Sequence, residues 1–143
     1  MNDGTSTRLQ PVRVGFANGD APTLVTTPEE LDGVLDELDR RARNDWPRIV
    51  LMDTDDHQNY FSIGVGAEMV PVNHADDRPG APVPCYAHSV GPDRAGEPQE
   101  WAYSNTWNEV PSERLIPADV ARLAARHWVL THERPDNIRW EAD

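Results

Sequence analysis

Two segments of the chain repeat apolar residues at the spacing of one helix face. In the first, the apolar positions are Leu31, Val34, Leu35 and Leu38. In the second, the stripe consists of Val120, Leu123, Ala124, His127 and Trp128. Residues three and four positions apart lie on the same side of an α-helix, so both patterns predict amphipathic helices. We expect the helices near residues 28–44 and 117–132.

Local signals at the ends of these segments support the same boundaries. Pro28 and Pro117 suit the first position of a helix, where the missing N–H needs no partner. Thr27 stands before Pro28, and Glu30 follows three residues after Thr27, which is the spacing of a capping box. Pro135 lies just beyond the second segment and is expected to stop it.

The other apolar residues alternate with polar ones or form short runs between turn signals, as strands do. The clearest candidates cover residues 11–16, 48–53, 60–66 and 99–106, and further candidates cover 23–26, 68–72, 83–90, 107–110 and 137–140. We interpret residues 73–82 as a loop. Short strands that follow one another favour antiparallel pairing. The sequence thus predicts an α+β fold: a mostly antiparallel sheet of about five to seven strands, with two main helices on one face.

One shared core is predicted, because both helical stripes and the inner face of the strands must be buried against each other. Its expected members are Trp140, Trp128, Leu123, Val120, Leu31, Leu35, Val50 and Ile63.

The length of 143 residues suits one domain, which we place at residues 10–143 after a polar, frayed N-terminus at 1–9. Cys85 is the single cysteine, so no intramolecular disulfide can form, as is typical of a reducing cytosol. No segment resembles a secretory signal or approaches the ~20 apolar residues of a membrane span. These features favour a cytoplasmic protein.

The net charge of the chain limits the classes of partner that it can bind. The chain has 13 basic residues, all arginine, against 25 acidic ones, and a formal net charge of −12. Such a balance argues against binding to nucleic acid or anionic membranes, and it allows steering toward a basic partner. Solubility alone would also account for an acidic surface.

Candidate metal ligands cluster at Asp53, Asp55, Asp56 and His57, and again at His74, Asp76 and Asp77. The first cluster fails the EF-hand pattern, because Gln58 stands at the sixth position and Gly64 at the twelfth. His127 and His132 are five residues apart, so the spacing of a zincin helix is absent as well. A small metal-assisted hydrolase that uses the Asp53–His57 turn and His74 stays an alternative, but we expect no catalytic group, metal or cofactor.

Aromatic residues stand beside carboxylates in the last predicted strands. Trp101 lies next to Glu100, and Trp107 lies close to Glu109. An exposed aromatic residue beside a carboxylate is typical of an anchor in a protein–protein interface.

The order of several short motifs resembles the immunity protein 1 family of bacterial polymorphic toxin systems. The matching pieces are Thr27-Pro28-Glu29-Glu30-Leu31, Phe61-Ser62-Ile63-Gly64-Val65-Gly66, Glu109-Val110-Pro111, Ile116-Pro117, Thr131-His132-Glu133-Arg134-Pro135 and Ile138-Arg139-Trp140. They span roughly residues 22 to 141. The family usually carries Phe where Trp128 stands and Gly where His132 stands.

The resemblance implies a protein that binds and neutralises a cognate toxin, often a nuclease or a nucleic-acid deaminase. A toxin that acts on nucleic acid is expected to be basic around its active site, which an acidic antidote would complement. Our expected toxin-binding residues are Asp53, Asp55, Asp56, Asp76, Asp77, Glu100, Trp101, Trp107 and Glu109. An acidic adaptor for another basic protein is the remaining alternative, and the sequence leaves the oligomeric state open.

Overall fold

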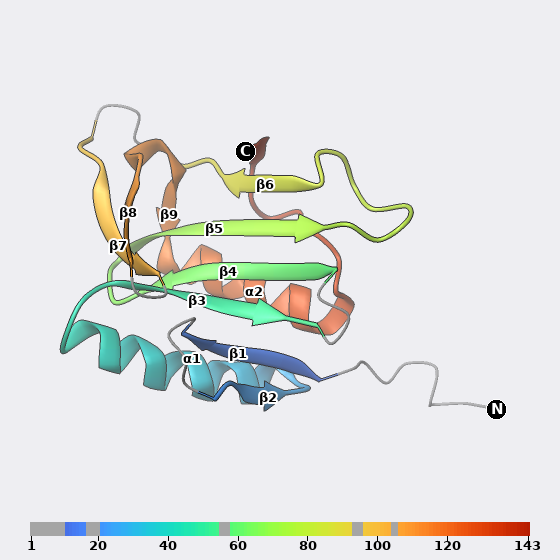
Figure 1. Cartoon of the computed structure of the whole chain (residues 1–143), viewed down its shortest axis with the longest axis horizontal. Coiled ribbons are helices and arrows are strands. Elements are labelled where there is room, and N and C mark those ends of the chain that lie inside the picture. Colours follow the sequence, from blue (N-terminus) through green and yellow to red (C-terminus); the bar gives the residue numbers. More distant parts are fainter. Residues whose placement is uncertain (1–10, 17–20, 55–57, 93–95, 104–105) are drawn as a thin grey trace.

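The structure is a computed structural model that describes residues 11–16, 21–54, 58–92, 96–103 and 106–143. The described residues form two α-helices, α1 (Pro28–Arg43) and α2 (Ala118–Thr131), and ten strands (Figure 1). The strands are β1 (Val12–Phe16), β2 (Thr23–Val25), β3 (Arg48–Asp53), β4 (Asn59–Val65), β5 (Met69–Asp76), β6 (Tyr86–Ser89), β7 (Gln99–Tyr103), β8 (Thr106–Val110), β9 (Leu115–Pro117) and β10 (Trp140–Ala142). The predicted frayed N-terminus lies outside the described residues.

A single path of neighbouring strands, β10-β6-β5-β4-β3-β1-β2, makes up most of the sheet. All neighbours on this path pair antiparallel, and β3 to β6 form a meander. Three further strands attach beside it: β7 pairs with β3 and β8, and β9 pairs with β5. The α+β class and the mostly antiparallel sheet are therefore confirmed.

The strands outnumber the predicted five to seven, because short elements join the sheet at its margins. Three of them, β2, β9 and β10, have only three residues each. No sequence pattern indicated β9, which forms from the three residues just before α2. The prediction of a loop from residue 73 was also wrong, because β5 continues to Asp76 through pairing with β4 and β6.

Both helices pack on the same face of the sheet, and the core lies between them and the strands (Figure 1). Alternate strand residues point into this layer, among them Val50, Phe61 and Ile63. The indole of Trp128 stacks on Phe61 with ring centroids 5.8 Å apart. Leu31, Leu35, Val50, Ile63 and Trp128 are buried as predicted.

The buried face of α2 differs from the predicted stripe. Leu123 is 61% exposed, and His127 is exposed as well, so both predictions were wrong. Val120 and Trp140 are partly buried and pack against the core from its margin. The face toward the sheet consists of Ala121, Ala124, Ala125, Trp128 and Val129. Alanines leave room for the helix backbone to approach the strands closely, and Trp128 fills the remaining space.

Candidate interaction site

The hairpin of β7 and β8 stands on the face of the sheet that the helices leave uncovered. Its only ladder contact with the described strands of the main path is one parallel bridge between Ala102 and Arg48. The Ala102 N–H also donates to the carbonyl of Pro47 at 3.0 Å. An isolated two-stranded hairpin is only marginally stable, and this one has few backbone hydrogen bonds to the sheet. It therefore needs a side chain that packs against the sheet.

Trp101 is that anchor, which corrects its prediction as an exposed interface residue. It is completely buried, and its ring lies against Gly64 of β4 and Pro71 of β5. A Cβ at position 64 would stand 2.7 Å from Cζ3 of Trp101 and 2.7 Å from Cδ of Pro71. Glycine is therefore required at this position so that the indole can reach the sheet.

The outer face of the hairpin carries an aromatic pair and a pair of carboxylates. Trp107, which is 56% exposed, meets Trp46 edge-on with ring centroids 4.8 Å apart. Glu100 and Glu109 are directly opposite each other in the β7–β8 register, and both are exposed. We call Trp46, Glu100, Trp107 and Glu109 the outer hairpin patch.

The two glutamates of this patch make no ion pair with any described residue. Like charges directly opposite on neighbouring strands are destabilising. The outer hairpin patch therefore holds negative charge that no described residue neutralises, beside an exposed aromatic surface.

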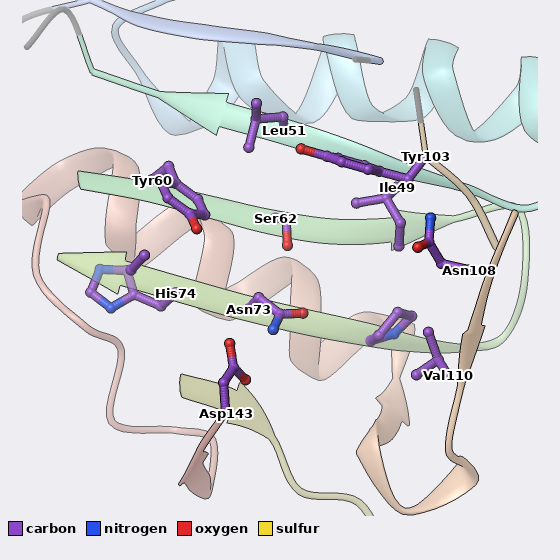
Figure 2. A pocket seen from close by; sticks show the side chains of 12 residues that line it. Ile49, Leu51, Tyr60, Ser62, Asn73, His74, Tyr103, Asn108, Val110 and Asp143 are labelled. Carbon is purple, nitrogen blue, oxygen red and sulfur yellow. The ribbon is translucent and has the colours of Figure 1, made fainter. Parts of the chain in front are cut away.

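The inner face of the hairpin closes a hollow over the sheet. Tyr103, Asn108 and Val110 project from the hairpin toward β3, β4 and β5 (Figure 2). The enclosed volume is about 240 Å³. We call this hollow the inner hairpin pocket; its lining residues are Ile49, Leu51, Tyr60, Ser62, Pro71, Asn73, His74, Ala75, Tyr103, Asn108, Val110 and Asp143.

The predicted acidic residues of the two turns do not join the hairpin. Asp53, at the end of β3, forms an ion pair with Arg13 of β1 at 3.2 Å. Asp55 and Asp56 lie outside the described residues. Asp77 is exposed and accepts a hydrogen bond from the Tyr86 hydroxyl at 2.9 Å.

Asp76 is not a surface charge, which corrects its place in the predicted set. It is 1% exposed, and its two oxygens accept hydrogen bonds from Nε and Nη2 of Arg78 at 2.9 and 2.8 Å. Burial opposes ionisation, but the hydrogen bonds and the charge of Arg78 outweigh it and hold the pKa of this carboxyl below its usual value. Asp76 therefore contributes to structure through a charge-assisted pair.

His74, the predicted partner of a metal-binding turn, is buried on the helix side of β5. Its Nδ1 accepts a hydrogen bond from Nε of Arg134 at 2.9 Å, so its Nε2 carries the proton and donates to Oδ1 of Asn59 at 3.0 Å. Burial and the charge of Arg134 lower its pKa to about 4. Both ring nitrogens are thus engaged in a neutral network, and neither is available to a metal.

No group of three or more His, Cys, Asp or Glu residues in the described part of the chain is arranged to hold a metal ion. No helix among those residues is long and apolar enough to cross a bilayer.

Three of the predicted residues lie on the outer face of the hairpin, whereas no prediction from the sequence concerned the inner hairpin pocket. Trp107, Glu100 and Glu109 come together with Trp46, whose role had no signal in the sequence. The pocket residues Tyr60 and Ser62 lie on the polar side of the alternating strand β4, and that alternation was visible. What it could not show is that the hairpin folds over them.

A family described as "Immunity protein Imm1" matches residues 19–142, which is most of the chain. No curated protein matches the sequence.

Proposed function

The chain belongs to the Imm1 family of immunity proteins, and we propose that it neutralises a cognate bacterial polymorphic toxin that acts on nucleic acid, as a deaminase or a nuclease does. The protein acts in the cytoplasm as a stoichiometric inhibitor and not as an enzyme. Its acidic surface covers the basic substrate cleft of the toxin. The net charge of −12 supports attraction to such a cleft over distances longer than a contact.

The outer hairpin patch is the observation that carries the proposal. Glu100 and Glu109 face each other at a cost to the folded chain, and a cation from a partner would remove that cost. Trp46 and Trp107 present aromatic area beside the carboxylates, and tryptophan is enriched among residues that dominate binding energy. A toxin cleft built to hold phosphates offers the arginine and lysine side chains that this surface complements.

The remaining predicted acids would act at the rim of the interface. Asp53, Asp55, Asp56 and Asp77 belong to this group, with Asp55 and Asp56 outside the described residues. Exposed rim charges act mainly on the rate of association. Asp76 and Trp101 support the surface from beneath, the first through Arg78 and the second under the hairpin.

Binding kinetics with the toxin encoded by the neighbouring open reading frame test the proposal. We expect tight binding of the wild type, loss of toxin activity at one equivalent, and rescue of cells that express the toxin. Trp107→Ala should shorten the lifetime of the complex, because a desolvated aromatic anchor acts on dissociation. Leu123→Ala is the matched control, since Leu123 is equally exposed but lies on α2, on the opposite side of the sheet.

Three results would count against the proposal. If the neighbouring toxin does not bind, the chain is not its antidote. If a basic protein without toxin activity binds in its place, the adaptor reading is correct. Unchanged lifetimes for both Trp107→Ala and Trp46→Ala would move the interface away from the hairpin.

A further inference from the structure

The inner hairpin pocket contains polar groups that the described residues leave without hydrogen-bond partners. The hydroxyls of Tyr60, Ser62 and Tyr103 and the side-chain amide of Asn73 make no hydrogen bond to any described residue. Figure 2 shows Ser62 and Asn73 side by side on β4 and β5, with Tyr103 above them and the carboxyl of Asp143 directed toward them. These groups converge from separate strands on one hollow, which is the arrangement of a binding site.

The pocket is negative as well as polar. None of its lining residues is arginine or lysine, and its one histidine, His74, is held neutral. Oδ1 of Asp143 accepts a hydrogen bond from His88 at 2.8 Å, while its second carboxylate oxygen forms no hydrogen bond or ion pair with a described residue. Burial, Tyr103 and the carboxylates of Asp143 and Asp77 all raise the pKa of Tyr60, which agrees with a negative local potential.

The walls of the pocket suit a ligand with an apolar stem. Ile49 and Leu51 of β3 form one side, and Pro71 and Val110 line the end near the hairpin. A long side chain could therefore lay methylene groups on aliphatic surface and bring a polar head to the hydroxyls, the amide and the carboxylate.

We propose that the inner hairpin pocket binds an arginine side chain presented by the toxin. This inference rests on the proposed function and names the chemistry that the toxin contributes. The guanidinium stacks on Tyr103 or Tyr60, donates to the carboxylate of Asp143, and donates to the oxygens of Asn73 and Ser62.

Arginine fits the lining better than other candidate ligands. Its planar head has five N–H donors in a fixed fork and stacks on aromatic rings, whereas the lysine ammonium is a compact, strongly hydrated point charge. A phosphate or nucleotide would meet a carboxylate and no cation here, so an anionic ligand is disfavoured. Asp143, Asn73 and Ser62 each offer the ligand a hydrogen-bond acceptor. An uncharged side chain such as asparagine has at most two N–H donors for them, whereas a guanidinium has five.

The first test needs no toxin. Arginine capped at both ends by acetyl and methylamide groups is titrated into the isotope-labelled chain, with equally capped citrulline and lysine as comparisons, and backbone amide shifts are followed by NMR. We expect capped arginine to shift the amides of residues 60–62, 73–75 and 108–110, and citrulline, which lacks the charge, to leave them unchanged. No shift at these residues, or equal shifts with citrulline, would overturn the proposal.

The second test uses Asp143→Asn and Tyr103→Leu against the neighbouring toxin, with Asp136→Asn as the matched control for charge loss at an exposed residue outside the pocket. We expect each pocket variant to bind roughly tenfold more weakly or worse, because Asp143→Asn loses a charge-assisted hydrogen bond and Tyr103→Leu loses a stacked aromatic ring. The control should bind like wild type. Thermal melting confirms that each variant is folded.

The two proposals fail separately. If capped arginine binds but the wild-type chain does not bind the toxin, the antitoxin function is wrong and the pocket stands. If the toxin binds wild type and both pocket variants equally, and capped arginine does not bind, the pocket is wrong and the antitoxin function stands.

Discussion

Asn59 joins β4 to the end of α2 through a fully buried side-chain amide. Its Oδ1 accepts from Nε2 of His74 and from Nε1 of Trp128, both at 3.0 Å, and its Nδ2 donates to the carbonyl of His132. His132 ends α2 with a φ of 55°, the left-handed conformation that glycine adopts without strain. A glycine at this position would adopt the same conformation without a Cβ penalty.

The hydrogen bond from Trp128 to Asn59 can be separated from the packing of its ring. Trp128→Phe removes the N–H donor and part of the ring volume, and we expect a loss of about 1–2 kcal/mol in the free energy of unfolding. Trp128→Ala also leaves a cavity and should cost about 3–5 kcal/mol. Urea denaturation of both variants measures the difference. Equal losses would show that packing and the hydrogen bond cannot be separated at this residue.

His74 makes the stability of the protein depend on pH. Its pKa is lowered from 6.5 to about 4 in the folded chain, so the unfolded chain takes up the proton first as the pH falls. Stability is therefore fully present above pH 6.5 and declines down to about pH 4, by up to about 3 kcal/mol in total. Urea denaturation at several pH values in this window measures the decline. A His74→Asn variant, which has no titrating ring, should lose most of the slope, and an identical slope in that variant would contradict the assignment.

At the scale of elements, the sequence predicted the ends of α2 well but only part of the side that it buries. Ala124 and Trp128 are buried as predicted, whereas the large apolar residues Leu123 and Leu130 are exposed and the small residues Ala121 and Ala125 face the sheet. Hydrophobic periodicity weights side chains by size, so it misplaces a helix that packs closely through small residues. The alternating strand β4 has no such ambiguity, and its Phe61 and Ile63 are buried as predicted.

The hairpin depends on the missing side chain at Gly64. A methyl group there would meet the indole of Trp101 and the ring of Pro71, so Gly64→Ala should destabilise the protein by about 1–3 kcal/mol through overpacking. Near-ultraviolet circular dichroism should change as well, because Trp101 would have to shift. Gly33→Ala, at a helix position where a methyl group meets nothing within 4 Å, is the control and should not lower stability. A Gly64→Ala protein with wild-type stability and spectrum would refute the anchoring role of Trp101.

At the scale of the whole molecule, the predicted site residues separate into groups with different tasks. Residue type led to the prediction that acids and tryptophans bind the toxin. Among them, Trp107, Glu100 and Glu109 share one exposed surface. Asp76 and Trp101 are also an acid and a tryptophan, but both are buried. Arg78 pairs with the Asp76 carboxylate, and Gly64 leaves the space that the Trp101 ring occupies. Those contacts join segments far apart in the chain, and a sequence pattern does not encode which distant residue meets which.

Glu100 and Glu109, which lie opposite each other, are expected to lower the stability of the unbound protein and to speed its association with the toxin. Glu109→Lys turns a like-charge pair into an opposite-charge pair, and we expect it to stabilise the unbound protein by roughly 0.5 kcal/mol. The same change should slow association with the toxin at low salt, and the difference should fade near 1 M salt, where the Debye length is about 3 Å. Thermal melting and stopped-flow association across a salt series measure the two effects. Faster association in the variant would contradict a cationic partner surface.

The strict alternation of the hairpin has an evolutionary consequence. Positions 101, 103, 108 and 110 face the sheet, and positions 100, 102, 107 and 109 face outward. An antidote must track a toxin that changes, and here every second residue can mutate while its neighbours keep the hairpin in place. In the proposed interface, the β7–β8 hairpin is thus a part of the molecule whose toxin specificity can change without a new fold, which is how one scaffold could serve many toxins.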